Sequence, residues 1–173
     1  MTATNFITSA QRTIKMEADA VAELQHRLDQ SFVTACETML ACEGRVIVTG
    51  MGKSGHIGNK IAATLASTGT PSFFVHPGEA SHGDLGMITK NDVVIVISNS
   101  GSTAEVITIL PLIKRLGIPM ISMTGDPESV LSTAALANLD VSVASEACPL
   151  NLAPTTSTTV TLAMGDALAI ALL

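Results

Sequence analysis

From Arg45 onward, short apolar runs alternate with helical segments, and this alternation constrains the fold more than any other feature of the chain. The runs are RVIVTG, PSFFVH, DVVIVIS, PMISMTG and NLDVSVA, beginning at Arg45, Pro71, Asp92, Pro119 and Asn138. Strands that are apolar on both faces are typical of a parallel sheet with helices on each side. The sequence therefore predicts an α/β fold: a three-layer α/β/α sandwich with a five-stranded parallel sheet of flavodoxin-like topology.

Residues 1–43 precede the first strand and predict an N-terminal helical arm. Apolar side chains recur there with helical spacing, and no Pro or Gly occurs between residues 3 and 43. Because about forty residues is long for one helix, we expect a break near residues 29–31. We therefore divide the chain into this arm and one domain of residues 44–173. The last helix, from about Pro154 to Leu173, has almost no polar face, so we interpret the chain as a domain of a longer protein.

Composition excludes several classes of partner. The net charge is −6, only nine residues are Lys or Arg, and Trp and Tyr are absent, which argues against a nucleic-acid partner. No segment predicts a membrane span or a signal peptide. Three cysteines without a metal-knuckle spacing favour a reducing cytoplasm. A hydrophobic share of 47% with 14% charged residues predicts buried subunit interfaces and argues against a monomer.

The first candidate loop is Gly50–His56 (GMGKSGH), which follows the first strand and opens a helix. Backbone N–H groups at such a helix start can bind an anion. The loop is not a Walker A motif, because Ile47 stands where that motif needs Gly. The spacing of Gly50, Gly52 and Gly55 does match GxGxxG, but no acidic residue ends the second strand. A dehydrogenase with a dinucleotide site is therefore disfavoured, and no cofactor is expected.

The second candidate loop, Ser98–Thr103 (SNSGST), contains four hydroxyls and one amide between a buried strand and a helix. Capping the helix needs only one hydroxyl, so we favour a phosphate site over a simple cap.

The third candidate loop, His76–Asp84, holds two histidines and two carboxylates in nine residues, which is enough for a role in proton transfer. Its spacing matches no common zinc pattern, and no metal site is predicted.

Three segments in order resemble the sugar isomerase (SIS) domain of bacterial D-arabinose 5-phosphate isomerases. They are GMGKSGHIGNKIAATLASTGTPSFFVHPGEASHGDLG, VISNSGSTAE and EACPLNLAPTTSTTVTLAMGDALA. The resemblance implies an aldose–ketose isomerase that interconverts D-ribulose 5-phosphate and D-arabinose 5-phosphate for the Kdo sugar of lipopolysaccharide. It also implies a cytoplasmic homotetramer. Members of the family carry a further His and two CBS domains beyond the SIS domain, and this sequence ends before them.

The resemblance also implies roles for individual residues. Its functional Lys, His and Glu correspond to Lys53, His82 and Glu105, with Glu105 expected as the base, His82 as a proton shuttle and Lys53 beside the developing oxyanion. The residues expected to bind the substrate phosphate are Ser54, Ser98, Asn99, Ser100 and Thr103. An ion pair between Lys53 and Glu105 is the structural alternative to their catalytic roles.

Other functions remain open at this point. A SIS domain can bind a sugar phosphate without turnover, as in some transcriptional regulators, or isomerise a different sugar such as a hexulose phosphate. A truncated, inactive domain of an isomerase is a further alternative. Outside the three loops, we expect Thr155, Thr156 and Ser157 to cap the last helix. Cys148 is expected to have an unactivated thiol, since no basic neighbour is evident.

Overall fold

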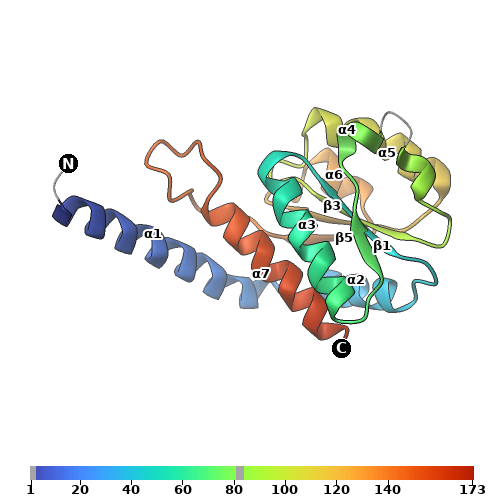
Figure 1. Cartoon of the computed structure of the whole chain (residues 1–173), viewed down its shortest axis with the longest axis horizontal. Coiled ribbons are helices and arrows are strands. Elements are labelled where there is room, and N and C mark those ends of the chain that lie inside the picture. Colours follow the sequence, from blue (N-terminus) through green and yellow to red (C-terminus); the bar gives the residue numbers. More distant parts are fainter. Residues whose placement is uncertain (1–2, 81–83) are drawn as a thin grey trace.

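The computed structural model describes residues 3–80 and 84–173 and has the predicted three-layer α/β architecture (Figure 1). Within these ranges, five parallel strands form one sheet in the order β2-β1-β3-β4-β5. The elements follow the chain as α1 (Ala3–Glu23), a 3-10 turn (Leu24–Arg27), α2 (Gln30–Leu40), β1 (Val46–Gly50), α3 (Gly52–Ser67), β2 (Ser72–Phe74), α4 (Pro77–Ala80), a 3-10 turn (Asp84–Met87), β3 (Val93–Ile97), α5 (Ala104–Leu116), β4 (Met120–Thr124), α6 (Val130–Ala134), β5 (Ala137–Asp140) and α7 (Thr156–Ala171).

Two hydrophobic clusters cover the two faces of the sheet. Alternate residues of each strand point to opposite faces, so Val48 packs against α2, α3 and α7, whereas Ile47 packs against α5 and α6. The central strands β1, β3 and β4 are buried at every position. Continuous burial of this kind is why these strands are apolar throughout instead of alternating.

The predicted break in the N-terminal arm is confirmed. After α1 and one 3-10 turn, Asp29 starts α2 by accepting a hydrogen bond from the Ser31 backbone N–H at 2.8 Å. Ala35 and Met39 of α2 are buried in the core of the sandwich. The first half of α1 projects away from the body instead (Figure 1), and its side chains Phe6, Ile7 and Ile14 are about 60–70% exposed.

α3 and α7 pack side by side on one face of the sheet (Figure 1). Gly165 permits this close packing: a Cβ at this position would lie 2.4 Å from Cγ1 of Ile61. An ion pair between Lys60 and Asp166 joins the same two helices at the surface. These contacts fix the N-termini of α3 and α7 relative to each other at the carboxyl edge of the sheet.

Local boundaries differ from the expectation in two places. The segment expected as a strand from Asn138 to Ala144 pairs only as far as Asp140, and the chain then leaves the sheet. The Gly50–His56 segment, expected as a loop, is helical from Gly52 onward.

Candidate functional site

The polar segments predicted to carry function follow strands whose ends lie at one edge of the sheet. The three candidate loops follow Gly50 of β1, Phe74 of β2 and Ile97 of β3. Because the strands are parallel, α3, α5 and α7 all direct their N-termini toward this carboxyl edge. Helix N-termini carry unpaired N–H groups and a partial positive charge, so this edge favours an anion.

The Ser98–Thr103 loop is held by its own hydroxyls. Ser98 is 3% exposed, its Oγ lies 2.8 Å from Oγ1 of Thr103, and it accepts a hydrogen bond from the Gly101 N–H at 3.1 Å. Oγ of Ser100 accepts from the Ser102 N–H at 3.3 Å. Within the described residues, the backbone N–H groups of Ser100, Thr103 and Ala104 donate to no acceptor. The loop therefore presents fixed, free donors at the start of α5.

Ser54 and Asn99, predicted to bind phosphate, line one small cavity of about 60 Å³. The start of α3 and the loop after β3 form one wall of this cavity, and α7 forms the other. The remaining lining residues are Ile57, Pro154, Ser157, Thr158 and Thr161. The fold thus brings together two predicted residues that are 45 positions apart in sequence.

Lys53 and Glu105 occupy the first turns of α3 and α5, and both are exposed. In the part of the chain that the structure describes, they form no ion pair with each other, so the structural alternative considered for this pair is not realised. His82 lies outside the described residues.

Glu146, which the sequence reasoning did not single out, organises the start of α7. Its carboxylate accepts hydrogen bonds from the Thr155 N–H at 2.8 Å, the Thr155 hydroxyl at 3.1 Å, the Ser157 N–H at 3.2 Å and the Ser157 hydroxyl. Burial alone raises the pKa of this carboxyl, but these hydrogen bonds, led by that of the Ser157 hydroxyl, outweigh it and lower the pKa. The carboxylate is therefore ionised at neutral pH.

This arrangement corrects the expectation that Thr155, Thr156 and Ser157 cap α7 themselves. Thr155 is the N-cap residue, yet its side chain makes no capping hydrogen bond to the helix. Instead, the hydroxyls of Thr155 and Thr156 both accept from the Ala147 N–H at 3.0 Å. A carboxylate nine to eleven residues upstream performs the capping. The sequence signal is an acidic residue before a Thr-Thr-Ser helix start, but the intervening turn hides it.

Cys148 also differs from its expectation. The backbone N–H groups of the turn that follows, led by that of Ala153, stabilise the thiolate and lower the pKa of the thiol. The sequence did not indicate this, because the donors belong to the backbone of a turn in which Asn151 adopts a φ of 51°.

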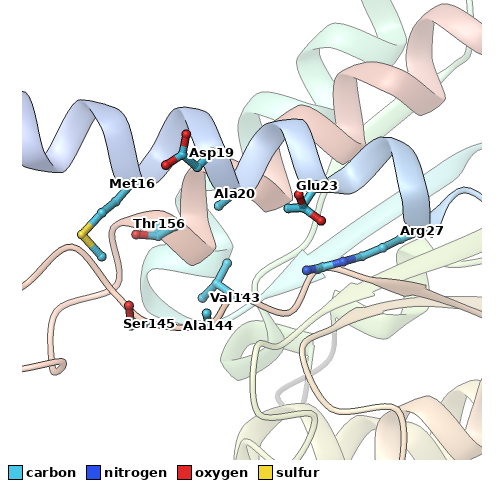
Figure 2. A pocket seen from close by; sticks show the side chains of 9 residues that line it. All are labelled: Met16, Asp19, Ala20, Glu23, Arg27, Val143, Ala144, Ser145 and Thr156. Carbon is cyan, nitrogen blue, oxygen red and sulfur yellow. The ribbon is translucent and has the colours of Figure 1, made fainter.

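A separate cleft of about 270 Å³ lies between α1 and the 143–145 segment that leads to Glu146 (Figure 2). Glu23 and Arg27 stand on its α1 side, and Val143 and Ser145 lie opposite. Arg27 also donates a hydrogen bond to the Ser142 carbonyl. None of the predicted site residues lines this cleft. Thr156, at the start of α7, also lines the cleft, which therefore borders the N-terminus of that helix.

Neither a metal-binding cluster nor a membrane-spanning helix occurs among the described residues. No group of three or more His, Cys, Asp or Glu side chains there could hold a metal ion. No helix in the same ranges is long and apolar enough to cross a membrane.

A model of the SIS domain matches residues 39–171. The arabinose 5-phosphate isomerase KdsD of Pseudomonas aeruginosa is 73% identical over 169 residues, which cover 98% of this chain and 52% of the relative. KdsD of Escherichia coli K12 is 59% identical over 169 residues, with the same coverage. The chain thus spans about half the length of the curated relatives it matches.

Solved structures show the same architecture. The E. coli CFT073 protein c3406, in complex with arabinose 5-phosphate, has a TM-score of 0.95 and 46% identity, and the match covers 99% of this chain and 92% of that one. The Vibrio vulnificus NanR protein complexed with ManNAc-6P has a TM-score of 0.80 at 22% identity, with coverage of 99% and 62%, and shows the fold alone.

Proposed function

The chain belongs to the SIS domain family, and from this premise we propose that it is an aldose–ketose isomerase interconverting D-ribulose 5-phosphate and D-arabinose 5-phosphate. One observation carries the proposal: free backbone donors and fixed hydroxyls meet at the start of α5, in a chain 73% identical to an arabinose 5-phosphate isomerase. The 46% identical structure in complex with arabinose 5-phosphate supports the same class of ligand.

The phosphate of the substrate binds at the start of α5 in this proposal. Ser98, Ser100 and Thr103 supply hydroxyls, and the free N–H groups at the loop complete the anion site without any Arg. Ser54 and Asn99, which line the cavity beside the loop, add further polar groups to the phosphate site. Anchoring the phosphate places C1 and C2 against the first turns of α3 and α5.

Isomerisation moves a proton between C1 and C2 through an enediol. Glu105 removes the proton from C2 of the aldose and returns it to C1, and His82 shuttles the proton between the two oxygens. Lys53 places a positive charge beside the enediolate oxygen. No redox cofactor takes part in this sequence, since the oxidation of one carbon balances the reduction of its neighbour.

Glu105→Gln tests this mechanism. Loss of the base is expected to lower kcat by about 10²-fold or more, while the affinity for D-arabinose 5-phosphate changes little. The measurement is an NMR assay in D₂O that follows ketose formation and deuterium entry, paired with calorimetric binding. An unchanged rate contradicts the role of Glu105. Binding by the wild-type chain without any turnover or deuterium entry supports a non-catalytic sugar-phosphate sensor instead.

Self-association, as a homotetramer, is part of this proposal. The first half of α1 supports it: Phe6, Ile7 and Ile14 extend the apolar stripe of this helix beyond the part that packs on the body, and all three are exposed. An isolated helical half of this length is marginal in water, so a second copy is the expected cover. Light scattering checks the state, and Ile7→Glu with Ile14→Glu is expected to reduce the mass.

The cellular role proposed is supply of D-arabinose 5-phosphate for the Kdo sugar of lipopolysaccharide, in the cytoplasm. Cys36, Cys42 and Cys148 are all free thiols, which supports a reducing compartment. Growth of a strain that requires D-arabinose 5-phosphate, with and without this chain expressed, tests the role.

A further inference from the structure

The Ser98–Thr103 loop rests on the end of β4, the segment that follows it and the start of α6. Three backbone hydrogen bonds connect them: Ser98 N–H donates to the Met123 carbonyl at 3.1 Å, Gly125 N–H to the Asn99 carbonyl at 2.9 Å, and Leu131 N–H to the Gly101 carbonyl at 3.1 Å. The loop is therefore positioned by a neighbouring part of the fold as well as by its own hydroxyls.

At Gly101, this contact leaves no room for a side chain on the loop, because Ser129 lies against the position of a Cβ. Gly101 is buried and has a φ of 61°, a conformation that favours glycine. A Cβ at Gly101 would lie 2.0 Å from Oγ of Ser129 and 2.3 Å from its Cβ. The loop backbone thus touches the Ser129 side chain directly, and any added atom must displace one of them.

Ser129 cannot easily yield to such an atom. It is 6% exposed, its hydroxyl donates to the Asp126 carbonyl at 2.7 Å, and its Oγ accepts from the Ser132 N–H at 3.3 Å. The second of these bonds caps α6. Because two hydrogen bonds hold the Ser129 side chain, it cannot readily move away from the loop backbone.

We propose that Ser129 is a positioning residue for phosphate binding: it sets the place of the free N–H groups of the loop without touching the ligand. The proposal rests on the proposed function of the loop as a phosphate site. Hydrogen-bond donors must lie within a few tenths of an ångström of their place to bind well. A change in the contact between Ser129 and the loop should therefore alter the affinity for the phosphate group more than the rate of the chemical step.

Three variants separate this effect from backbone strain. Gly101→Ala places a methyl group against Ser129. Gly117→Ala is the matched control, because Gly117 has a similar φ of 69° at the end of α5 but no atom within 4 Å of an added Cβ. The double variant Gly101→Ala with Ser129→Gly removes the obstructing side chain, and glycine is tolerated at a helix N-cap.

The measurements are steady-state kinetics with D-arabinose 5-phosphate and calorimetric binding of the same sugar phosphate and of inorganic phosphate. For Gly101→Ala, KM and the dissociation constant for phosphate are expected to rise about tenfold, with kcat within about twofold of wild type. Gly117→Ala is expected to leave all three within about twofold. Adding Ser129→Gly to Gly101→Ala is expected to recover most of the loss. Equal effects of the two alanine variants, or no recovery in the double variant, overturn the proposal.

Hydrogen exchange of the loop amides gives a readout that needs no turnover. Gly101→Ala is expected to speed exchange at the hydrogen-bonded amides of Ser98, Gly101 and Ser102 by about tenfold, and Ser129→Gly to reverse it. A wild-type chain that binds inorganic phosphate but shows no turnover contradicts the proposed isomerase and leaves the Ser129 proposal to the binding and exchange data. A wild-type chain that binds neither phosphate nor the sugar phosphate contradicts both.

Discussion

The N-termini of α5 and α7 lie at the same edge of the sheet, but the partial positive charge at each helix start is balanced in a different way. At α7, the N–H groups of Thr155 and Ser157 donate to the Glu146 carboxylate, so the helix carries its own anion. At α5, neutral hydroxyls hold the loop, and the N–H groups of Thr103 and Ala104 have no acceptor within the described residues. The start of α7 binds a carboxylate of the chain itself, and the start of α5 is open to an anion from outside.

The two helix starts are therefore expected to contribute differently, one mainly to the stability of the fold and the other mainly to ligand binding. A filled N-terminus contributes to folding, because its donors are paired in the native state. An open one leaves donors for a ligand and contributes less to folding. Changes at α7 should therefore act first on the free energy of unfolding, and changes at α5 should act first on ligand affinity.

The largest effect on stability is expected for Glu146→Ala. Four donors lose their acceptor, and two of these donors are backbone N–H groups at a helix start. We expect a loss of about 2–3 kcal/mol in the free energy of unfolding, since hydrogen bonds to charged groups contribute most. Urea denaturation measures it. Glu37→Ala, at an exposed site on α2, is the control and is expected to change stability by less than about 0.5 kcal/mol.

A pH series sharpens the same contrast. The pKa of Glu146 is lowered from its usual 4.5 in the folded chain, so its contribution is fully present above pH 4.5 and is lost as the pH falls through the lowered value. We expect the wild type to lose stability below about pH 4.5 more steeply than Glu146→Gln, whose side chain does not titrate. Unfolding midpoints at several pH values measure it. Parallel curves for the two proteins would show that another carboxyl, such as the buried Asp92 with its lowered pKa, dominates acid unfolding.

A smaller effect on stability is expected at α5. Ser98→Ala removes one of the two acceptors of the Gly101 N–H, which also donates to the Ser98 carbonyl at 3.0 Å, and the partner of the Thr103 hydroxyl. This change should cost about 1 kcal/mol and weaken phosphate binding. Ser102→Ala, in the same loop but exposed, is the matched control for stability. Denaturation and calorimetry on both variants measure the two effects. If Ser98→Ala destabilises the chain as much as Glu146→Ala, the contrast between the two helix starts is wrong.

The sheet could be predicted because its signal is local. The buried strands β1, β3 and β4 are continuous apolar runs, and the polar segments between them can be recognised in the sequence. The length of β5 was not predictable in this way. Val141 is buried and β-branched, yet it lies beyond the last pair of the ladder with β4, which ends at Asp140. Pairing depends on where the neighbouring strand stops, and composition does not record that.

The residues of the candidate site also differ in whether their signal is local in the sequence. Residues of the Ser98–Thr103 loop were predictable because their chemistry is contiguous in sequence. Glu146 was not, since its role depends on a turn that brings it back to residues nine and eleven positions later. That turn is closed by the Asn151 side chain, which accepts from the Glu146 N–H at 2.8 Å. The roles of Lys53, His82 and Glu105 stay predictions until kinetics test them.

The hydroxyl loop at α5 has one consequence for how binding should respond to its surroundings. Ser98–Thr103 contains no side chain that gains or loses a proton near neutral pH. The ligand is then the group that titrates there: a phosphate monoester takes its second charge near pH 6. The charge of the loop therefore stays constant near neutral pH, and only the charge of the bound ligand changes. Any pH dependence of binding at this loop therefore comes from the balance between the singly and doubly charged forms of the sugar phosphate.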